Sequence, residues 1–340
     1  MKMTLQNKKE GDDMSKNKEI AKDGSFKRQS ALFSKPFGNK TGESPLETDR
    51  YRLIWAAPCP WSHRAVIVRK LLGLKSVFSL GKVDPIRPYI AQVDWAFTLD
   101  ENDVDPVLQI PYLSDIYTKT DPSYAGRPTV PVVIDLKERK VVTNDYFTLT
   151  TEMETAWKDF HKKGAPNLYP EKLRTEIDLL NEQIYHDVNN GVYKCGFAKS
   201  QAAYEQAYDV LFARLDELEA RLAGQRFLFG DFITEADVRL YVTLARFDIA
   251  YYSAFKANKK RLIDYPNLWD YARDLYQTDG FGTTTDFRAI KEHYYVSARL
   301  AGVGRKEDII IPKGPEVTGW AEDPQRAHLS QSVEKFLTTT

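Results

Sequence analysis

WAAPCPWSHR (residues 55–64) is the stretch that decides the fold, because it joins an apolar segment to a helical pattern around one cysteine. Residues 51–57 predict a short buried strand. From Pro60 onward, apolar residues recur at helical spacing, and they end at Gly73, a residue type typical of the position after a helix. A second strand is predicted at 77–80. The segment therefore forms a strand–helix–strand unit, for which a right-handed crossover is expected.

The next segment interrupts this rhythm before strands return. Residues 84–128 are rich in Pro, Asp and Tyr with little periodicity, so we predict a long insertion. Residues 129–135 and 141–142 predict a β-hairpin. Pro131 falls inside its first strand, which indicates a strand edge, a bulge or a cis bond. A helix from 145 to 160 is expected to close this first domain.

Strand signals vanish after residue 170, and helical patterns replace them. Ser200 predicts the start of a long helix that ends at Gly224. Thr234 followed by Asp237 predicts a second helix start of the capping-box type. Further helices are predicted at 171–190, 268–277 and 286–295, and a surface tail from about residue 311. The layout is a mixed α/β domain followed by an all-α domain.

The composition indicates a globular protein without a charge preference. Its 340 residues contain 48 Lys+Arg and 48 Asp+Glu, which favours neither a nucleic acid nor a membrane as a partner. No apolar run approaches the roughly 20 residues of a membrane-spanning helix, and the polar first residues predict no secretory signal. Two cysteines make no disulfide framework, so a reducing, cytoplasmic setting is expected. The sequence predicts no metal site and no nucleotide-binding loop.

Cys59 is predicted to lie between the strand and the first turn of the helix. Pro60 suits helix position N1, where its missing N–H is not needed. The sulfur then faces the free N–H groups of the first turn, which favour the reactive thiolate. Ser62 is within reach to donate a hydrogen bond to the sulfur. Because Ser62 stands where Cys-x-x-Cys oxidoreductases carry their second cysteine, an outside thiol must resolve a mixed disulfide on Cys59.

A second interpretation of Cys59 stays open, since free cysteines often fill protein cores. The strand–Cys–Pro–helix context favours the reactive interpretation. Cys195 lacks that context and is predicted to be structural. His63 and Arg64 are predicted to be solvated or packing residues on the helix.

Six separated segments are similar to one known family. Cys59-Pro60-Trp61-Ser62-His63-Arg64 resembles the CPW-[A/S]-HR motif of the Xi-class glutathione transferases, the glutathionyl-hydroquinone reductases. The other similar segments are WAF at 95–97, GRPTVPV at 126–132, NNGVYKCGFAKSQAAYE at 189–205, ARFD at 245–248, and IKEHYY at 290–295 followed by IPKGP. The resemblance covers roughly residues 50 to 315.

The resemblance implies a thioredoxin-like domain followed by a helical glutathione-transferase domain, commonly in a homodimer. Residues 1–45 are polar, Lys-rich and interrupted by Gly and Pro, so we expect a disordered or extended N-terminal arm there. The thioredoxin-like, thiol-binding domain is expected over 46–162 with the 84–128 insertion, the helical substrate domain over 168–311, and a C-terminal tail over 312–340.

The resemblance also implies an activity, because members of the family reduce glutathionyl-hydroquinones. Their cysteine thiolate attacks the glutathione sulfur of the conjugate, hydroquinone leaves, and a second glutathione releases oxidised glutathione. Cys59 matches this nucleophile. Trp95, Arg127 and Val130 match the thiol-binding segments, with Val130 acting through its main chain and Pro131 as the cis proline.

Tyrosines are the residues that the resemblance places near the aromatic substrate. Tyr193 and Tyr294 match such tyrosines, and a phenol can hydrogen-bond or protonate a leaving group. Tyr252 and Tyr295 are rival substrate-binding candidates. For each tyrosine, packing in a core or on the surface is the alternative.

One departure from the family concerns the thiol subsite. Family members usually carry Asn-Glu-Ser after the hairpin, where the Glu-Ser pair holds the γ-glutamyl end of glutathione. This sequence has Asn144-Asp145-Tyr146. Asp145 keeps the carboxylate on a shorter side chain, and the Tyr146 ring can fill the γ-glutamyl pocket. Another low-molecular-weight thiol is therefore an alternative to glutathione.

Three functions follow from these patterns. The first is a glutathione-dependent reductase that acts on small aromatic, quinol-type thiol conjugates through Cys59. The second is an omega-like thiol transferase that removes glutathione from proteins or small disulfides. The third is a non-catalytic binding or regulatory protein on the same fold, which the altered Asp145-Tyr146 pair makes credible. The sequence does not identify the physiological quinone.

Overall fold

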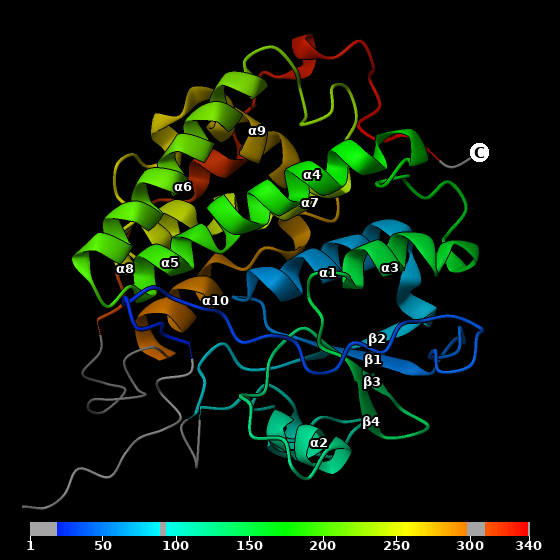
Figure 1. Cartoon of the computed structure of the whole chain (residues 1–340). Helices are drawn as coiled ribbons and strands as arrows, with labels where there is room; N and C mark the ends of the chain where they lie inside the picture. Colours follow the sequence, from blue (N-terminus) through cyan, green and yellow to red (C-terminus); the bar gives the residue numbers. More distant parts are fainter. Residues whose placement is uncertain (1–18, 89–92, 298–309, 339–340) are drawn as a thin grey trace, which may run out of the picture.

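The computed structural model describes residues 19–88, 93–297 and 310–338 (Figure 1). The first domain contains β1 (Tyr51–Trp55), α1 (Pro60–Leu72), β2 (Phe78–Lys82), α2 (Leu113–Thr120), β3 (Val132–Asp135), β4 (Lys140–Thr143) and α3 (Leu149–Thr155). The helices that follow are α4 (Arg174–Gln183), α5 (Gly191–Phe197), α6 (Gln201–Leu222), α7 (Glu235–Arg246), α8 (Tyr252–Ala254), α9 (Pro266–Tyr276) and α10 (Phe287–Lys291). Among the described residues, no helix has the length and apolar content needed to span a membrane.

The four strands form one mixed sheet in the order β2-β1-β3-β4. β1 and β2 are parallel, as the strand–helix–strand prediction requires, and β3 pairs antiparallel with both β1 and β4. Gly73 ends α1 with a left-handed φ of 77°, so the predicted helix stop is confirmed. The Val130–Pro131 bond is cis, and β3 begins directly after it. This order is that of a thioredoxin-like domain, as expected.

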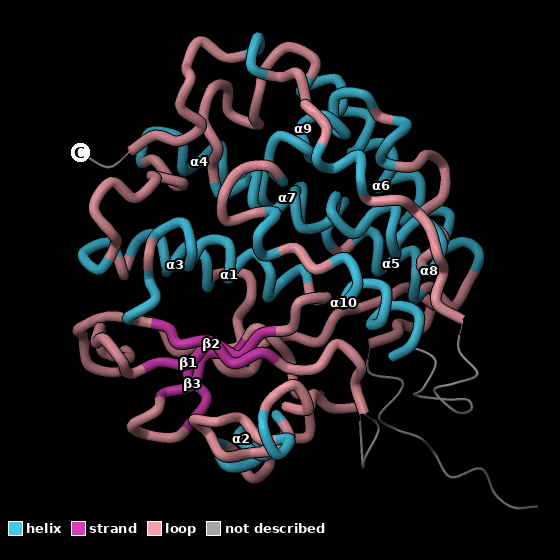
Figure 2. The backbone as a smooth tube through the Cα atoms, turned by 180° about the vertical axis from the view of Figure 1, so that it is seen from behind, coloured by secondary structure: helices cyan, strands magenta, loops and turns pink. Residues whose placement is uncertain are grey.

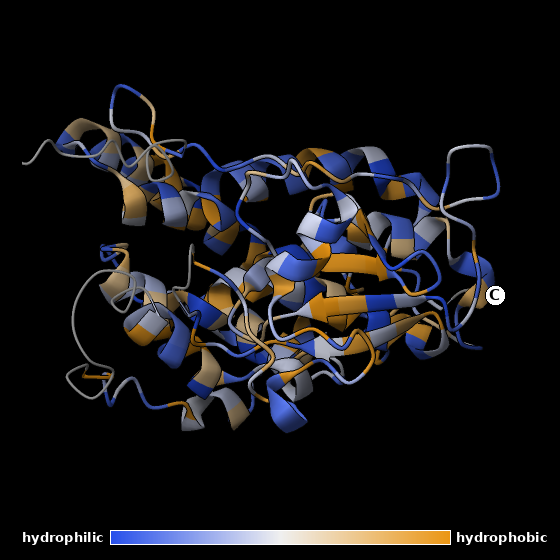
Figure 3. Ribbon diagram, turned by 90° about the horizontal axis from the view of Figure 1, so that it is seen from below, coloured by the Kyte–Doolittle hydropathy of each residue, from blue (hydrophilic) through white to orange (hydrophobic). Residues whose placement is uncertain are grey.

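Both faces of the sheet are covered, which makes β1 its buried centre. Leu53 and Trp55 pack in the larger core with α1 and α3, whereas Ile54 packs in a second core on the opposite face. The alternation follows from the two-residue period of a strand. α1 and α3 lie on one side of the sheet and α2 lies on the other (Figure 2). Figure 3 shows the strands largely in the hydrophobic colour.

The 84–128 segment contains a structural helix that sequence periodicity did not reveal. α2 presents Leu113, Ile116 and Tyr117 to the second core, and all three are buried. Asp105 from the same segment accepts two hydrogen bonds from buried Arg52, at 2.9 and 2.6 Å. Part of this segment therefore completes the second layer of the domain. The helix predicted over 145–160 is also shorter, since α3 ends at Thr155.

The helical part follows the predicted starts closely. The Ser200 side chain caps α6 by accepting from the Ala203 amide, and Thr234 and Asp237 form a capping box on α7. Three π-helical segments, Ile184–Asn189, Phe247–Tyr251 and Glu292–Ser297, were not predicted. Such segments occur frequently at functional sites because they change which side chains face inward.

The two terminal segments are bound to the body along their described lengths. Residues 19–45 run from the helical part to the sheet (Figure 1). The amide of Lys199 donates to Gly24 at one end, at 2.8 Å, and the amide of Asn144 donates to Phe33 at the other, at 2.9 Å. In the C-terminal tail, Arg326 is buried and donates to carbonyls next to α6. The predicted surface tail is thus anchored by a buried cation.

Candidate active site

Cys59 occupies the N-cap of α1, and Pro60 is the first residue of the helix. The sulfur is half-buried, and its S–H donates to the carbonyl of Val130 at 3.4 Å. That carbonyl belongs to the residue before the cis proline, so two separate loops meet at the sulfur. The free N–H groups of the first turn lie at this end of α1 and favour an anion there.

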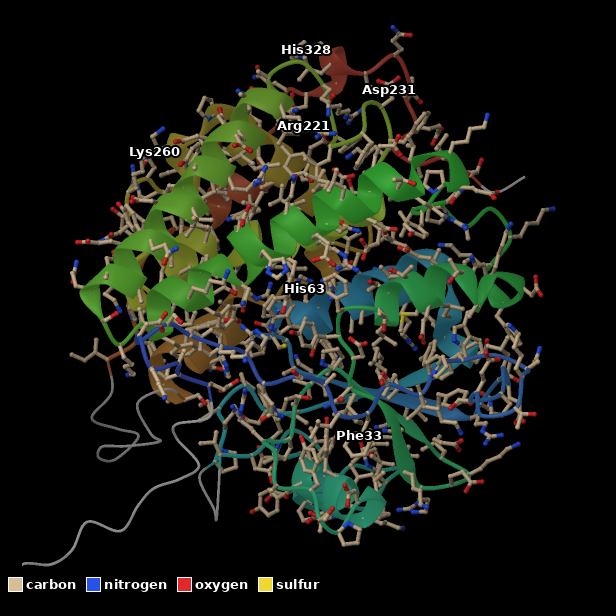
Figure 4. All side chains as sticks on the ribbon, in the orientation of Figure 1. Phe33, His63, Arg221, Asp231, Lys260 and His328 are labelled. Carbon is tan, nitrogen blue, oxygen red and sulfur yellow. The ribbon has the colours of Figure 1, made fainter. Side chains whose placement is uncertain are left out.

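The residues that follow Cys59 are buried, so of the two predicted roles for His63 and Arg64 the structure supports packing and not solvation. The Ser62 hydroxyl is buried and has no hydrogen-bond partner among the described residues, so the expected bond to the sulfur is absent there. His63 lies on α1 where the helix meets the helical part (Figure 4). Burial, and to a smaller extent the positive charge of Arg246, lowers the pKa of His63 well below its ordinary value. The imidazole is therefore neutral. Arg64 donates to the main-chain carbonyl of Tyr146.

Arg246, from the ARFD segment, fixes the loop that carries Cys59. Its Nε donates to the carbonyl of Pro58 at 2.7 Å, and its Nη2 donates to the carbonyl of Ala57 at 2.8 Å. Its Nη1 lies 3.2 Å from His63 Nδ1. A buried side chain of α7 therefore holds the main chain just before the reactive cysteine, which couples the two domains at the site.

A pocket with about 610 Å³ of empty space, partly open to solvent, surrounds Cys59. It includes most of the residues predicted from sequence. Those that line it are Cys59, Trp95, Arg127, Val130, Tyr146, Tyr193 and Tyr294. The thiol-binding candidates and the first two tyrosine candidates thus come together around one sulfur.

Three predicted site residues do not line this pocket. Asp145 accepts from the Phe147 amide at 3.0 Å and so shapes the turn before α3. Tyr252 is half-buried at the start of α8. The Tyr295 hydroxyl donates to the carbonyl of Ile249 at 3.2 Å and contacts Ser253.

Tyr251, rather than Tyr252, joins the tyrosine cluster. The Tyr294 hydroxyl lies 2.7 Å from that of Tyr193 and 3.0 Å from that of Tyr251. Burial raises the pKa of each of the three phenols, and it does so most strongly for Tyr251 and Tyr294. All three therefore keep their protons at neutral pH. Tyr251 and Tyr294 both sit in π-helical segments, which shifts them off the ordinary helical face.

Sequence reasoning missed four pocket residues with chemistry of their own: Arg28, Gln29, Arg87 and His293. His293 stacks on Trp95 at 5.4 Å between ring centroids, and its Nδ1 donates to the carbonyl of Pro85 at 2.7 Å. Burial lowers the pKa of His293 to about 4, so the ring is neutral. His293 stands in the IKEHYY motif beside Tyr294, and that position was the signal that could have found it.

A thioredoxin-like domain with a reactive-type cysteine at a helix N-terminus, facing a helical domain, defines a glutathione transferase. Residues 201–274 match the family model of the glutathione S-transferase C-terminal domain. Glutathionyl-hydroquinone reductase YqjG of Escherichia coli is 38% identical over 309 residues, covering 86% of this chain and 93% of that protein. Glutathione S-transferase omega-like 2 of Schizosaccharomyces pombe is 39% identical over 304 residues, covering 87% and 95%. The chain therefore belongs to the Xi-class glutathione transferases, the glutathionyl-hydroquinone reductase family.

Solved structures agree with this assignment. A glutathione transferase from Gordonia bronchialis is 51% identical with a TM-score of 0.79, covering 84% of this chain and 87% of that one. The Xi transferase of Phanerochaete chrysosporium is 38% identical with a TM-score of 0.80, covering 88% and 95%. Glutathione-bound YqjG is 39% identical with a TM-score of 0.76, covering 85% and 91%.

Proposed function

We propose that the protein is a thiol-dependent reductase that removes glutathione from glutathionyl-hydroquinones through Cys59. The observation that carries the proposal is the meeting of two unlike groups in one pocket. Cys59 lies at the N-terminus of α1, and the hydrogen-bonded pair Tyr193 and Tyr294 lines the same pocket from the helical domain. A thiolate and a proton donor are the two groups that cleavage of an aryl thioether by thiol attack requires.

The reaction proceeds in two steps, and in each step a thiolate attacks a sulfur atom. The Cys59 thiolate attacks the glutathione sulfur of the conjugate, an S–S bond forms, and the bond between that sulfur and the aromatic carbon breaks. The carbon takes the electron pair and one proton, so free hydroquinone leaves. A second glutathione, as thiolate, then attacks the mixed disulfide, and oxidised glutathione departs while the Cys59 thiolate is restored.

The electrostatics of the pocket support these roles. Arg28, Arg87 and Arg127 line the pocket together with Cys59, so the sulfur lies among positively charged side chains. Burial raises the pKa of Tyr294 well above its ordinary value, so its hydroxyl enters the reaction protonated. A neutral phenol can donate that proton to the leaving carbon, directly or by way of Tyr193, and the rest of the tyrosine cluster holds it in place.

The test is to replace Cys59 with alanine and to measure hydroquinone release from its glutathionyl conjugate. The expected result is loss of turnover to the uncatalysed rate with an unchanged fold. Cys195→Ala is the matched control, because it removes the other cysteine, which is buried outside the pocket, and it should keep the activity. Undiminished turnover in Cys59→Ala would refute the proposal.

We propose glutathione as the thiol. This choice needs a test because the Tyr146 ring lies in the pocket. The Tyr146 ring lies 4.8 Å from the Trp61 ring between centroids, and its hydroxyl lies 2.9 Å from that of Tyr185. The ring therefore occupies part of the pocket where a small residue would leave space. Mass spectrometry of the oxidised protein, incubated with glutathione and with other small thiols, identifies the adduct on Cys59. A preferred adduct other than glutathione would replace it in the proposal.

A second candidate function is deglutathionylation of small or protein disulfides. It is favoured by the omega-like name of the Schizosaccharomyces pombe relative. Turnover of a glutathionyl-hydroquinone and of a small mixed disulfide should be compared in the wild type and in Tyr294→Phe. Loss confined to the aromatic substrate favours the reductase, because only that reaction must protonate a carbon.

The homodimer implied by the family is also part of the proposal. Sedimentation equilibrium of the full chain should give twice the mass of one chain. The mass of a single chain would remove the dimer from the proposal and leave the chemistry at Cys59 as stated.

A further inference from the structure

The N-terminal arm contributes a cation to the Cys59 pocket. Arg28 and Gln29 line the pocket, although they precede the first strand of the sheet. Gln29 fastens the arm there, because its side chain accepts from the Arg127 amide at 3.2 Å and donates to the Arg127 carbonyl at 3.3 Å. Arg127 also pairs with Glu19 of the arm at 3.2 Å. The arm is thus tied to the thiol-binding loop on both sides of Arg28.

Arg28 itself is held between the two domains. Its guanidinium carbon lies 4.8 Å from the Trp61 ring centroid and 4.5 Å from that of Tyr193. Its Nε donates to the side-chain oxygen of Asn190 at 2.8 Å. Cation–π contacts on two aromatic rings fix the plane of the guanidinium without using its outer N–H groups.

The Arg28 guanidinium has an unused donor. Nη2 of Arg28 is buried and has no hydrogen-bond partner among the described residues. The two other arginines that line the pocket are engaged: Arg127 pairs with Glu19, and Arg87 donates to the carbonyls of Val93 and Asp94. A buried, unpaired donor on a permanent cation is costly unless a ligand acceptor reaches it.

We propose that Arg28 is a specificity-determining residue of this pocket, and that its guanidinium binds a carboxylate of the ligand that enters. A carboxylate matches the planar donor edge of arginine and forms charge-assisted hydrogen bonds with it. The inference rests on the proposed function, since it names a group of the substrate that the Cys59 pocket holds. The carboxylate has two possible sources, the glutathione part or an acidic substituent on the aromatic ring.

The experiment measures binding by calorimetry in a Cys59→Ser background, so that no turnover or mixed disulfide is needed. Two ligand pairs differ in their free carboxylates, by two in the first pair and by one in the second. They are glutathione against its diethyl ester, and gentisate against hydroquinone. Each ligand is titrated into the Cys59→Ser protein and into the same protein with Arg28→Gln, which keeps a donor for Asn190 but removes the charge. Lys27→Met is the matched control, because Lys27 is the exposed neighbouring cation of the arm.

Arg28→Gln should weaken the carboxylate member of one pair about tenfold or more, which corresponds to about 1.4 kcal/mol. It should leave the partner without free carboxylates unchanged. A selective loss for glutathione assigns the thiol as the source of the carboxylate, and a selective loss for gentisate assigns the aromatic ring. Equal losses within both pairs, or no loss in either, overturn the inference, and so does failure of all four ligands to bind. Lys27→Met should change none of the affinities.

A second variant separates charge from shape. Arg28→Lys keeps the cation but loses the planar fork, so it should recover part of the carboxylate affinity that Arg28→Gln loses. No recovery would mean that the carboxylate needs the planar fork of Arg28 and not its charge alone. The proposed function is judged separately, by hydroquinone release from the wild type. Selective carboxylate binding without that release would leave Arg28 in its role and reject the reductase.

Discussion

The two sides of the pocket are built in different ways. The Cys59 side is made of main chain: a helix N-terminus, a carbonyl of Val130 and the loop of Ala57 and Pro58. The opposite side is made of side chains from distant segments, with Tyr193 and Tyr294 hydrogen-bonded to each other and Arg28 reaching in from the arm.

This difference indicates that the two sides have different roles: the Cys59 side generates the nucleophile, and the tyrosine side recognises the substrate. Main-chain donors at a helix end come with the fold, and such donors favour an anion at the position that Cys59 occupies. The tyrosine side depends on which residues α5, the π-helical segment Glu292–Ser297 and the arm present. Such residues can change without changing the fold. We therefore expect substitutions on the Cys59 side to lower turnover of every substrate. Substitutions on the tyrosine side should lower turnover of particular substrates only.

We expect the largest effect on stability and turnover from a change at Arg246. This residue of the helical domain holds the main chain on the Cys59 side of the pocket. Arg246→Met leaves the carbonyls of Ala57 and Pro58 buried without their donor. We expect the free energy of unfolding to fall by about 4 kcal/mol, and the turnover of the remaining folded protein to fall with every substrate. Urea unfolding and initial rates test this.

Arg226→Met is the matched control for that change. Arg226 is also buried and pairs with Asp274 at 2.8 Å, and it does not line the pocket. It should lose comparable stability while kcat stays within about twofold of the wild type. Equal loss of kcat in both variants would show that Arg246 acts through global stability alone.

Tyr294→Phe should impair the tyrosine side of the pocket without changing the Cys59 side. The change removes the hydroxyl that bonds to Tyr193 and Tyr251. We expect kcat for a glutathionyl-hydroquinone to fall about a hundredfold, whereas reduction of a small mixed disulfide, which needs no proton on carbon, changes little. Tyr252→Phe should leave both rates unchanged, because Tyr252 does not line the pocket. Equal effects of the two variants would remove Tyr294 from the proposed chemistry.

The main-chain half was predictable from sequence because its determinants are local. Cys59, Pro60 and Gly73 set the start and the end of α1 within a few residues of themselves. The capping box at Thr234 is likewise a short-range feature and was expected. The residues alone left the cis bond at Pro131 as one of three alternatives, and the family resemblance favoured it. Local rules suffice where neighbouring residues decide the conformation of the main chain.

The tyrosine side of the pocket was predictable only in part, because π-helical segments and long-range packing determine which residues face it. An inserted residue in a π-helical segment rotates every side chain that follows by about 100°, and no local pattern in the sequence marked it. Tyr251 therefore faces Tyr294, although Tyr252 was the candidate. Arg28 was missed because its role arises from long-range packing on Trp61 and Tyr193, and α2 was missed within a segment of low periodicity.

His293 gives the tyrosine side a pH dependence of stability. Burial lowers the pKa of His293 from an ordinary value of 6.5 to about 4 in the folded protein. The unfolded chain therefore binds a proton that the folded chain rejects, and stability is lost as the pH falls from about 6.5 toward 4. We expect about 2 kcal/mol of this loss between pH 7 and pH 5. Urea unfolding at both pH values should show a shallower dependence in His293→Gln, and an identical slope would contradict the assignment.

Tyr146 is the point where the main-chain side departs from the family pattern, and its effect should be the smallest. Its ring packs on Trp61, and its hydroxyl bonds to Tyr185. Tyr146→Ser introduces the small hydroxyl residue that the resemblance leads us to expect at this position. The KM for glutathione should therefore fall about fivefold, or about 1 kcal/mol, with kcat unchanged. Tyr185→Phe removes the same hydroxyl contact without opening space and should leave KM unchanged. If KM is unaffected in Tyr146→Ser, the ring does not narrow the thiol subsite, and specificity is then set on the tyrosine side alone.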